Sequence, residues 1–107
     1  MTTETTTIAQ TILDQLGGGR FVRMTGAKRL VALDRNDSRR GGLTFAVGRN
    51  DKRVTHVIVT LTHDDLYNVE YVWCRGTTRI VRATDEGIYH DMLVRSFERE
   101  TGLVTSL

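Results

Sequence analysis

The segments Arg53-Val-Thr-His-Val-Ile-Val-Thr-Leu-Thr62 and Leu66-Tyr-Asn-Val-Glu-Tyr-Val-Trp-Cys-Arg75, on either side of the turn His63-Asp-Asp65, decide the fold. Both segments alternate between apolar and more polar side chains, which is the period of a β-strand. The expected core face of the first carries Val57, Val59 and Leu61, and that of the second carries Tyr67, Val69, Tyr71 and Trp73. Such alternation favours two antiparallel strands that form a hairpin.

Further strand-like segments lie on both sides of this hairpin, separated by glycine-containing or polar turns. Gly26-Ala27 is interpreted as one such tight turn, and residues 35–42 as an exposed loop. Most connections are short, which favours hairpins over helical crossovers. The other expected strands are Arg20–Thr25, Lys28–Asp34, Gly42–Gly48 and Thr78–Ala83. The sequence therefore predicts an antiparallel sheet of about five to six strands.

Helical periodicity occurs near both ends of the chain. Ile8, Ile12, Leu13 and Leu16 form one apolar stripe, with a capping box at Thr7 and Gln10 and a stop at Gly17-Gly18-Gly19. A second helix is expected from about Glu86 to Thr101, with Asp85 as its N-cap and Gly102 as its stop. We expect an α+β fold with one short N-terminal and one longer C-terminal helix. Residues 1–7 are expected to be a flexible N-terminus and residues 8–107 a single domain.

Composition and charge narrow the classes of protein that fit. The chain has 107 residues, one cysteine (Cys74), and no long apolar run or basic leader, so we expect a protein of the reducing cytoplasm without a membrane partner. The net charge of +2 divides into +5 for residues 1–53 and −3 for residues 54–107. A charge division of this kind suits an electrostatic contact surface.

Several segments carry a family resemblance. They are Gln10-Thr-Ile-Leu-Asp-Gln-Leu-Gly-Gly18, Phe21, Met24-Thr-Gly-Ala-Lys28, Phe45, Arg49-Asn50, Tyr67, Val69-Glu70, Glu86-Gly-Ile-Tyr89, Phe97 and Glu100-Thr-Gly-Leu103. Together they resemble a family of small bacteriophage and prophage proteins of unknown function. The resemblance spans most of the chain and implies the cytoplasm of a host bacterium. It implies no activity and brings no catalytic residues with it.

The residues with reactive side chains do not form a coherent catalytic set. His63 and His90 lie beside acidic residues, as metal or acid–base sites require, but neighbours in a strand or helix point in different directions. His56 and Cys74 have no local partner that would activate them. The glycine-rich segments lack the strand–loop–helix context of a phosphate loop. We therefore expect no enzyme activity, no metal and no cofactor.

Two functions from different classes remain. The first is a non-catalytic protein-interaction module that binds a host or phage protein, or a second copy of itself as a homodimer. Its expected interface is the sheet face that carries Ala46, Val54, His56, Ile58 and Val72. This face is available only if both helices lie on the other side of the sheet, which the sequence leaves open.

The alternative is weak, sequence-tolerant binding of nucleic acid by basic loops. The expected contacts are Arg35, Arg39, Arg40, Arg49, Lys52 and Arg53. These side chains could contact phosphates, but stacking on bases is not expected because Tyr67, Tyr71 and Trp73 are assigned to the core.

Overall fold

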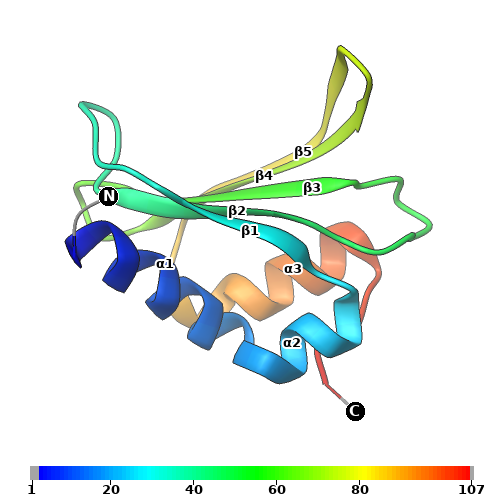
Figure 1. Cartoon of the computed structure of the whole chain (residues 1–107), viewed down its shortest axis with the longest axis horizontal. Helices are drawn as coiled ribbons and strands as arrows, with labels where there is room; N and C mark the ends of the chain where they lie inside the picture. The colour runs from blue at the N-terminus through cyan, green and yellow to red at the C-terminus, as the bar shows by residue number, and fades with distance from the viewer. Residues whose placement is uncertain (1–2, 107) are drawn as a thin grey trace.

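The two alternating segments form neighbouring strands of a five-stranded antiparallel sheet (Figure 1). In the computed structural model, which describes residues 3–106, Val59 of one strand lies opposite Val69 of the other. The order of the strands across the sheet is their order along the chain. The elements are α1 (Thr3–Leu16), α2 (Gly18–Thr25), β1 (Lys28–Leu33), β2 (Gly41–Ala46), β3 (His56–Leu61), β4 (Tyr67–Arg75), β5 (Thr78–Ile88), the 3₁₀ turn η1 (His90–Met92) and α3 (Leu93–Thr101). The predicted α+β class is confirmed.

The three α-helices cover the same face of the sheet, and among residues 3–106 no helix covers the other face (Figure 1). The question that the sequence left open is thereby answered. The strands β4 and β5 continue beyond their neighbours as a hairpin that rises away from the helices. A register shift between Tyr71 and Val72 marks the point where this hairpin leaves the regular ladder, as expected for a β-bulge.

An aromatic cluster joins the helices to the sheet. Phe21 of α2 contacts Phe45 of β2 and Phe97 of α3, with ring centroids 5.4 and 5.0 Å apart and edge-to-face geometry. All three rings are at most 1% exposed. The stripe of α1 packs beside them through Ile8, Ile12 and Leu16.

The expected strand at Arg20–Thr25 is wrong, because these residues belong to α2. Gly17 has a φ of 127°, which lets the chain turn after α1 and begin a second helix. Phe21 and Thr25 are both buried while Arg23 between them is exposed, which fits a helical face, since a strand would place all three residues on one side. Gly26, with φ 69°, caps α2 by donating its N–H to the carbonyl of Val22, so it is a helix stop and not a hairpin turn.

The expected helix from Glu86 to Thr101 is wrong over its first part. β5 continues to Ile88, which pairs with Tyr67, so Asp85 lies in a strand and caps no helix. The pairing partner that β4 offers outweighs the helical pattern here. Gly102 is confirmed as the stop, with φ 75° and its N–H bonded to the carbonyl of Glu98 at 2.9 Å.

The N-terminal helix starts earlier than expected. α1 begins at Thr3, so most of the segment that we expected to be flexible is helical, while residues 1 and 2 lie outside the described residues. The predicted capping box at Thr7 and Gln10 therefore lies inside the helix. Gln10 instead donates to Asp14 at 2.9 Å, and Thr11 donates to the carbonyl of Thr7. α1 is also longer than α3, the reverse of the expected lengths.

The first testable prediction concerns the aromatic cluster. Phe97→Ala should lower the free energy of unfolding by about 3–5 kcal/mol, because it removes a buried ring that contacts both Phe21 and Phe45. Urea denaturation followed by circular dichroism measures this loss. Val104→Ala is the control, because Val104 is 53% exposed and should change stability by less than about 0.5 kcal/mol. Equal losses for the two variants would contradict the assigned core.

Candidate functional site

Three segments that are distant in sequence lie at the same end of the sheet. They are residues 18–29 (α2 and the start of β1), 47–55 (the β2–β3 loop) and 73–82 (the tip of the β4–β5 hairpin). A row of paired residues, Lys28, Ala46, His56 and Val72, crosses the sheet at this end. The N–H of Gly48 donates to the carbonyl of Thr25 at 2.9 Å, which ties the β2–β3 loop to the end of α2. We call these three segments the basic end.

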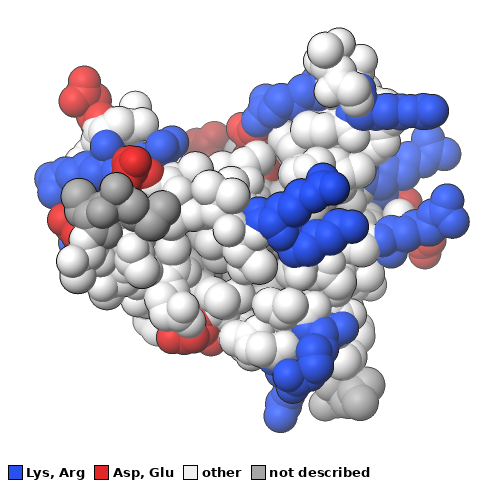
Figure 2. Space-filling view, viewed as in Figure 1, with Lys and Arg blue, Asp and Glu red and all other residues white. Residues whose placement is uncertain are grey.

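The basic end carries more positive charge than the first half of the sequence, residues 1–53, which has a net charge of +5. It contains ten lysines and arginines and a single acid, Asp51, for a formal charge of +9. The rest of the chain contains five arginines and twelve acids, for a formal charge of −7. Figure 2 shows lysine and arginine gathered over this end, while the other end mixes both signs. The basic side chains are Arg20, Arg23, Lys28, Arg29, Arg49, Lys52, Arg53, Arg75, Arg79 and Arg82.

Few of these cations are neutralised within the molecule. Within residues 3–106, Arg79 is the member of the basic end that forms an ion pair, and its partner is Glu70. The other nine have no carboxylate of the described chain within ion-pair distance. The positive potential of this end is therefore directed to solvent and to any anion that approaches.

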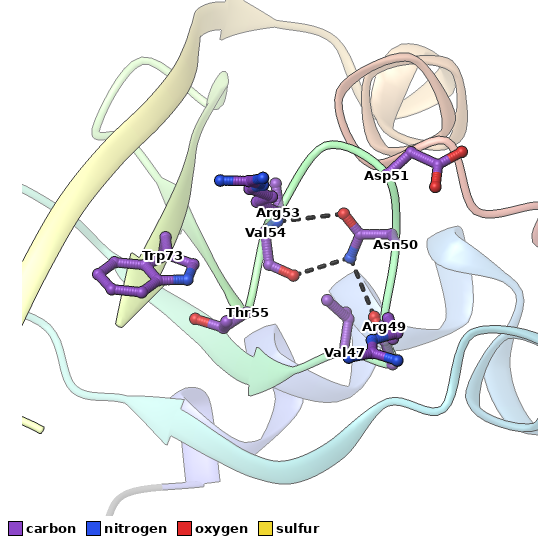
Figure 3. Close-up of a pocket in the computed structure, with 9 residues that line it drawn as sticks. Val47, Arg49, Asn50, Asp51, Arg53, Val54, Thr55 and Trp73 are labelled. Carbon is purple, nitrogen blue, oxygen red and sulfur yellow. Dashed lines mark hydrogen bonds between the residues drawn. The ribbon is translucent and has the colours of Figure 1, made fainter. Parts of the chain in front are cut away.

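The β2–β3 loop is held rigid by one side chain. The amide nitrogen of Asn50 donates to the carbonyls of Gly48 and Val54 at 2.9 and 2.8 Å, and its oxygen accepts from the N–H of Val54 at 3.1 Å (Figure 3). Arg53 has a left-handed φ of 59°, which is uncommon for a residue other than glycine. The three bonds of Asn50 fix the backbone of the loop from which Arg49 and Arg53 project.

An open hollow of about 710 Å³ lies between this loop and β4. Its lining combines cations with apolar side chains, among them Arg49, Arg53, Val54 and Trp73. In Figure 3 Arg53 and Trp73 lie on the same side of the loop, and Asp51 points away from them. Trp73 was expected in the core together with Tyr67 and Tyr71. The two tyrosines are buried there, but Trp73 is only half-buried and stands outside the core cluster.

The six basic residues expected to bind nucleic acid do not form one site. Arg49, Lys52 and Arg53 belong to the basic end, whereas Arg35, Arg39 and Arg40 lie at the opposite end of the sheet. Arg40 forms ion pairs with Glu4 and Asp65 there. Arg35 also lies 3.9 Å from Glu4, and Arg39 donates to the carbonyl of Asp34.

The basic residues that sequence analysis did not include in this site lie in α2, at the start of β1 and in the β4–β5 hairpin. They are Arg20, Arg23, Lys28, Arg29, Arg75, Arg79 and Arg82. The strand order would have predicted this grouping. In an antiparallel sheet whose strands follow one another in sequence, every second connection lies at the same end of the sheet.

The residues expected at a protein interface separate into two groups. Ala46, His56, Ile58 and Val72 share the open face, which lies opposite the helices, as the pairings Ala46–His56 and His56–Val72 require. Ala46 and Val72 are nevertheless 5% and 1% exposed, so of these four only His56 and Ile58 are partly accessible. Val54 is only 3% exposed and belongs to the core cluster on the helix side, so its expected place on the open face is wrong. The expected position assumed that the alternation of β3 extends back to Val54. Because β3 begins at His56, Val54 lies in the preceding loop, where alternation does not decide which way a side chain points.

The reactive residues remain separate from one another. His63 contacts the carbonyl of Asn36, His56 contacts the hydroxyl of Thr55, and His90 is exposed in η1. Cys74 is a half-buried free thiol. Between residues 3 and 106, no group of three or more histidine, cysteine, aspartate or glutamate side chains is arranged to hold a metal ion.

A buried polar chain connects the sheet to α3. The Tyr71 and Ser96 hydroxyls are 2.7 Å apart, Ser96 donates to Asp85, and Arg99 donates to the same carboxylate at 2.7 Å. Because Ser96 donates to Asp85, its oxygen accepts the Tyr71 proton. Burial raises the pKa of Tyr71, since the charged phenolate would lose its hydration, although the contact with Ser96 partly opposes this. Ser96 is 2% exposed, so its hydroxyl joins β4, β5 and α3 inside the molecule, while Arg99 closes the chain at the surface.

Comparisons with models of protein families, with curated proteins and with solved structures find no match to this chain. No helix within residues 3–106 combines the length and the apolar character needed to cross a bilayer.

The second prediction concerns the alkaline stability of the polar chain. A raised pKa means that the folded state keeps the Tyr71 proton where the unfolded state loses it, so stability is full below the ordinary value of 10.0 and falls above it. Tyr71→Phe should lower the free energy of unfolding by about 1 kcal/mol at neutral pH. It should also reduce the further loss between about pH 9.5 and 11. Urea titrations across this range measure both effects, and an equal alkaline loss in the two proteins would contradict the assignment.

Proposed function

We propose that this protein binds nucleic acid through the sugar–phosphate backbone, with the basic end as the contact surface. The observation that carries the proposal is the formal charge of +9 on three segments at one end of the sheet that contain one acid. A charge of this density attracts a polyanion and releases the ions condensed on it, which supplies most of the affinity of sequence-tolerant binding.

The loop geometry supports contacts with phosphates. Asn50 fixes the β2–β3 loop before any ligand arrives, so Arg49, Lys52 and Arg53 lose less conformational freedom on binding than side chains of a flexible loop would. A helix that could read bases in a groove has little support. α2 is only 8 residues long, and α3 carries Glu98 and Glu100 beside its arginines. Binding should therefore depend strongly on salt and weakly on sequence.

The third prediction tests this surface with a pair of double variants that remove the same charge. Arg49→Ala/Arg53→Ala should weaken binding to all sequences by about tenfold at low salt, because two exposed ion pairs are lost. The salt dependence of log K should become shallower by about 1.4 to 1.8. Mobility-shift titrations at several salt concentrations measure both quantities.

The matched control is Arg35→Ala/Arg39→Ala, which removes two charges at the opposite end of the sheet. It should change the affinity and the salt slope much less. If the two double variants weakened binding equally, or if neither duplex nor single strand bound at tens of micromolar protein, the basic end would not be the binding surface.

The open sheet face favours a second candidate function, association with a second copy of this chain. Within residues 3–106 no helix lies over this face. It carries Val31, Ile58 and Val81, with Thr44 and Glu70 on either side of Ile58. Val31 and Val81 are 51% and 47% exposed. A two-fold arrangement with opposed strand directions would set the +9 end of each copy against the acid-bearing end of the other. A host or phage protein of similar surface remains the other partner that this face would fit.

The fourth prediction is that light scattering at micromolar concentration gives twice the 12.1 kDa chain mass. Ile58→Lys should return the mass to that of one chain, because it introduces a charge at the middle of the face. Val104→Lys, at an exposed apolar residue outside this face, should leave the dimer intact. A wild-type protein with the mass of one chain would eliminate this candidate.

A further inference from the structure

On the basis of the proposed function, we infer that the basic end selects single-stranded nucleic acid, with Trp73 as the platform on which an unpaired base stacks. The inference depends on an aromatic side chain that the core does not use and that lies among unpaired cations. Phosphate attraction alone does not distinguish a single strand from a duplex, whereas a stacking platform does, because a duplex hides the faces of its bases.

Trp73 occupies the position where the core face of β4 continues past the helices. Tyr71, two residues earlier on the same face, is 1% exposed, but Trp73 is half-buried. Ile80, its pairing partner on β5, is 46% exposed, so the platform continues onto the neighbouring strand. Aromatic rings held at such a boundary provide an apolar surface that a ligand can reach.

The backbone on both sides of Trp73 is tied to the β2–β3 loop. Thr55 donates its N–H to the carbonyl of Val72 at 2.8 Å, and its hydroxyl accepts the N–H of Cys74 at 2.8 Å. These bonds fix the distance between the ring and the loop that carries Arg49 and Arg53. Base and phosphate sites are thus positioned relative to each other before a strand binds.

The hollow has the chemistry of a nucleotide site. Trp73 contributes the accessible apolar surface, since Val47 and Val54 are only 8% and 3% exposed. Arg49 and Arg53 contribute positive charge beside the single acid Asp51. Its volume of about 710 Å³ lies within the usual range of small-ligand sites. The side-chain amide of Asn50 forms its three hydrogen bonds with the backbone of the loop, so it is not free to bond to the edge of a base. Stacking without base-edge contacts predicts tolerance of sequence.

The experiment uses intrinsic fluorescence, because Trp73 is the single tryptophan of the chain. The full-length protein is titrated with an oligo(dT) strand of about 12 nucleotides and, separately, with a duplex of equal length. We expect tighter binding of the single strand, accompanied by quenching of the Trp73 emission. A poly-glutamate peptide of similar charge serves as a second anion and should cause no comparable quenching.

Two variants test whether the ring itself carries the preference. Trp73→Ala should weaken binding of oligo(dT) by roughly 5- to 150-fold and binding of the duplex much less. Trp73→Phe, which keeps a smaller ring, should retain an intermediate affinity. Mobility shifts measure both variants, and urea denaturation establishes that they are folded. If Trp73→Ala does not fold, the wild-type titrations and Trp73→Phe decide the question.

The outcomes separate this inference from the function on which it rests. Equal affinity for both nucleic acids without quenching, together with weaker binding by Arg49→Ala/Arg53→Ala, would overturn stacking and leave backbone binding intact. Equal binding and quenching by poly-glutamate would overturn the assignment of a base site. Absence of binding to any nucleic acid at low salt would overturn both.

Discussion

Each strand of the sheet pairs with its neighbours in sequence, and this constraint determines where everything else in the molecule lies. Because the chain reverses direction at every strand, its connections alternate between the two ends of the sheet. The α2–β1 segment, the β2–β3 loop and the β4–β5 hairpin therefore meet at one end, and the remaining turns meet at the other. A charge of +5 spread over residues 1–53 becomes +9 on these three segments, while the remaining acids are distributed over α1, the other turns, β4, β5, η1 and α3.

Charge gathered in this way opposes folding through repulsion among the cations. The structure tolerates it because the cations lie on the surface, in contact with water, while the core is anchored elsewhere. Phe21, Phe45 and Phe97 join α2, β2 and α3, and Asn50 fixes the loop by hydrogen bonds that do not involve the charged groups. A bound polyanion would relieve the repulsion, so binding and stability are coupled in the same direction.

The sequence predicts the sheet better than the helices, for a physical reason. β3 and β4 each contain several alternations, and period two over that length has no competing interpretation. Arg20–Thr25 is too short for its period to separate one turn and a half of helix from a strand, so α2 was missed. At Asp85 and Glu86 the local sequence favours a helix. These residues form a strand instead because they lie beside β4, and sequence rules that consider only neighbouring residues do not include this contact. Tertiary contacts decide such segments.

The site was less predictable than the fold, and Trp73 shows why. Alternation correctly places its ring on the same face as Tyr71, but alternation says nothing about how far along that face the helices extend. Tyr71 lies beneath the helical layer and binds Ser96 of α3, whereas Trp73 lies beyond the end of that layer. Trp73 therefore has apolar neighbours on one side and the cations of the β2–β3 loop on the other. This boundary is produced by the mismatch between the lengths of the strand and the helical layer, and it leaves a partly exposed aromatic ring beside the cations of the β2–β3 loop.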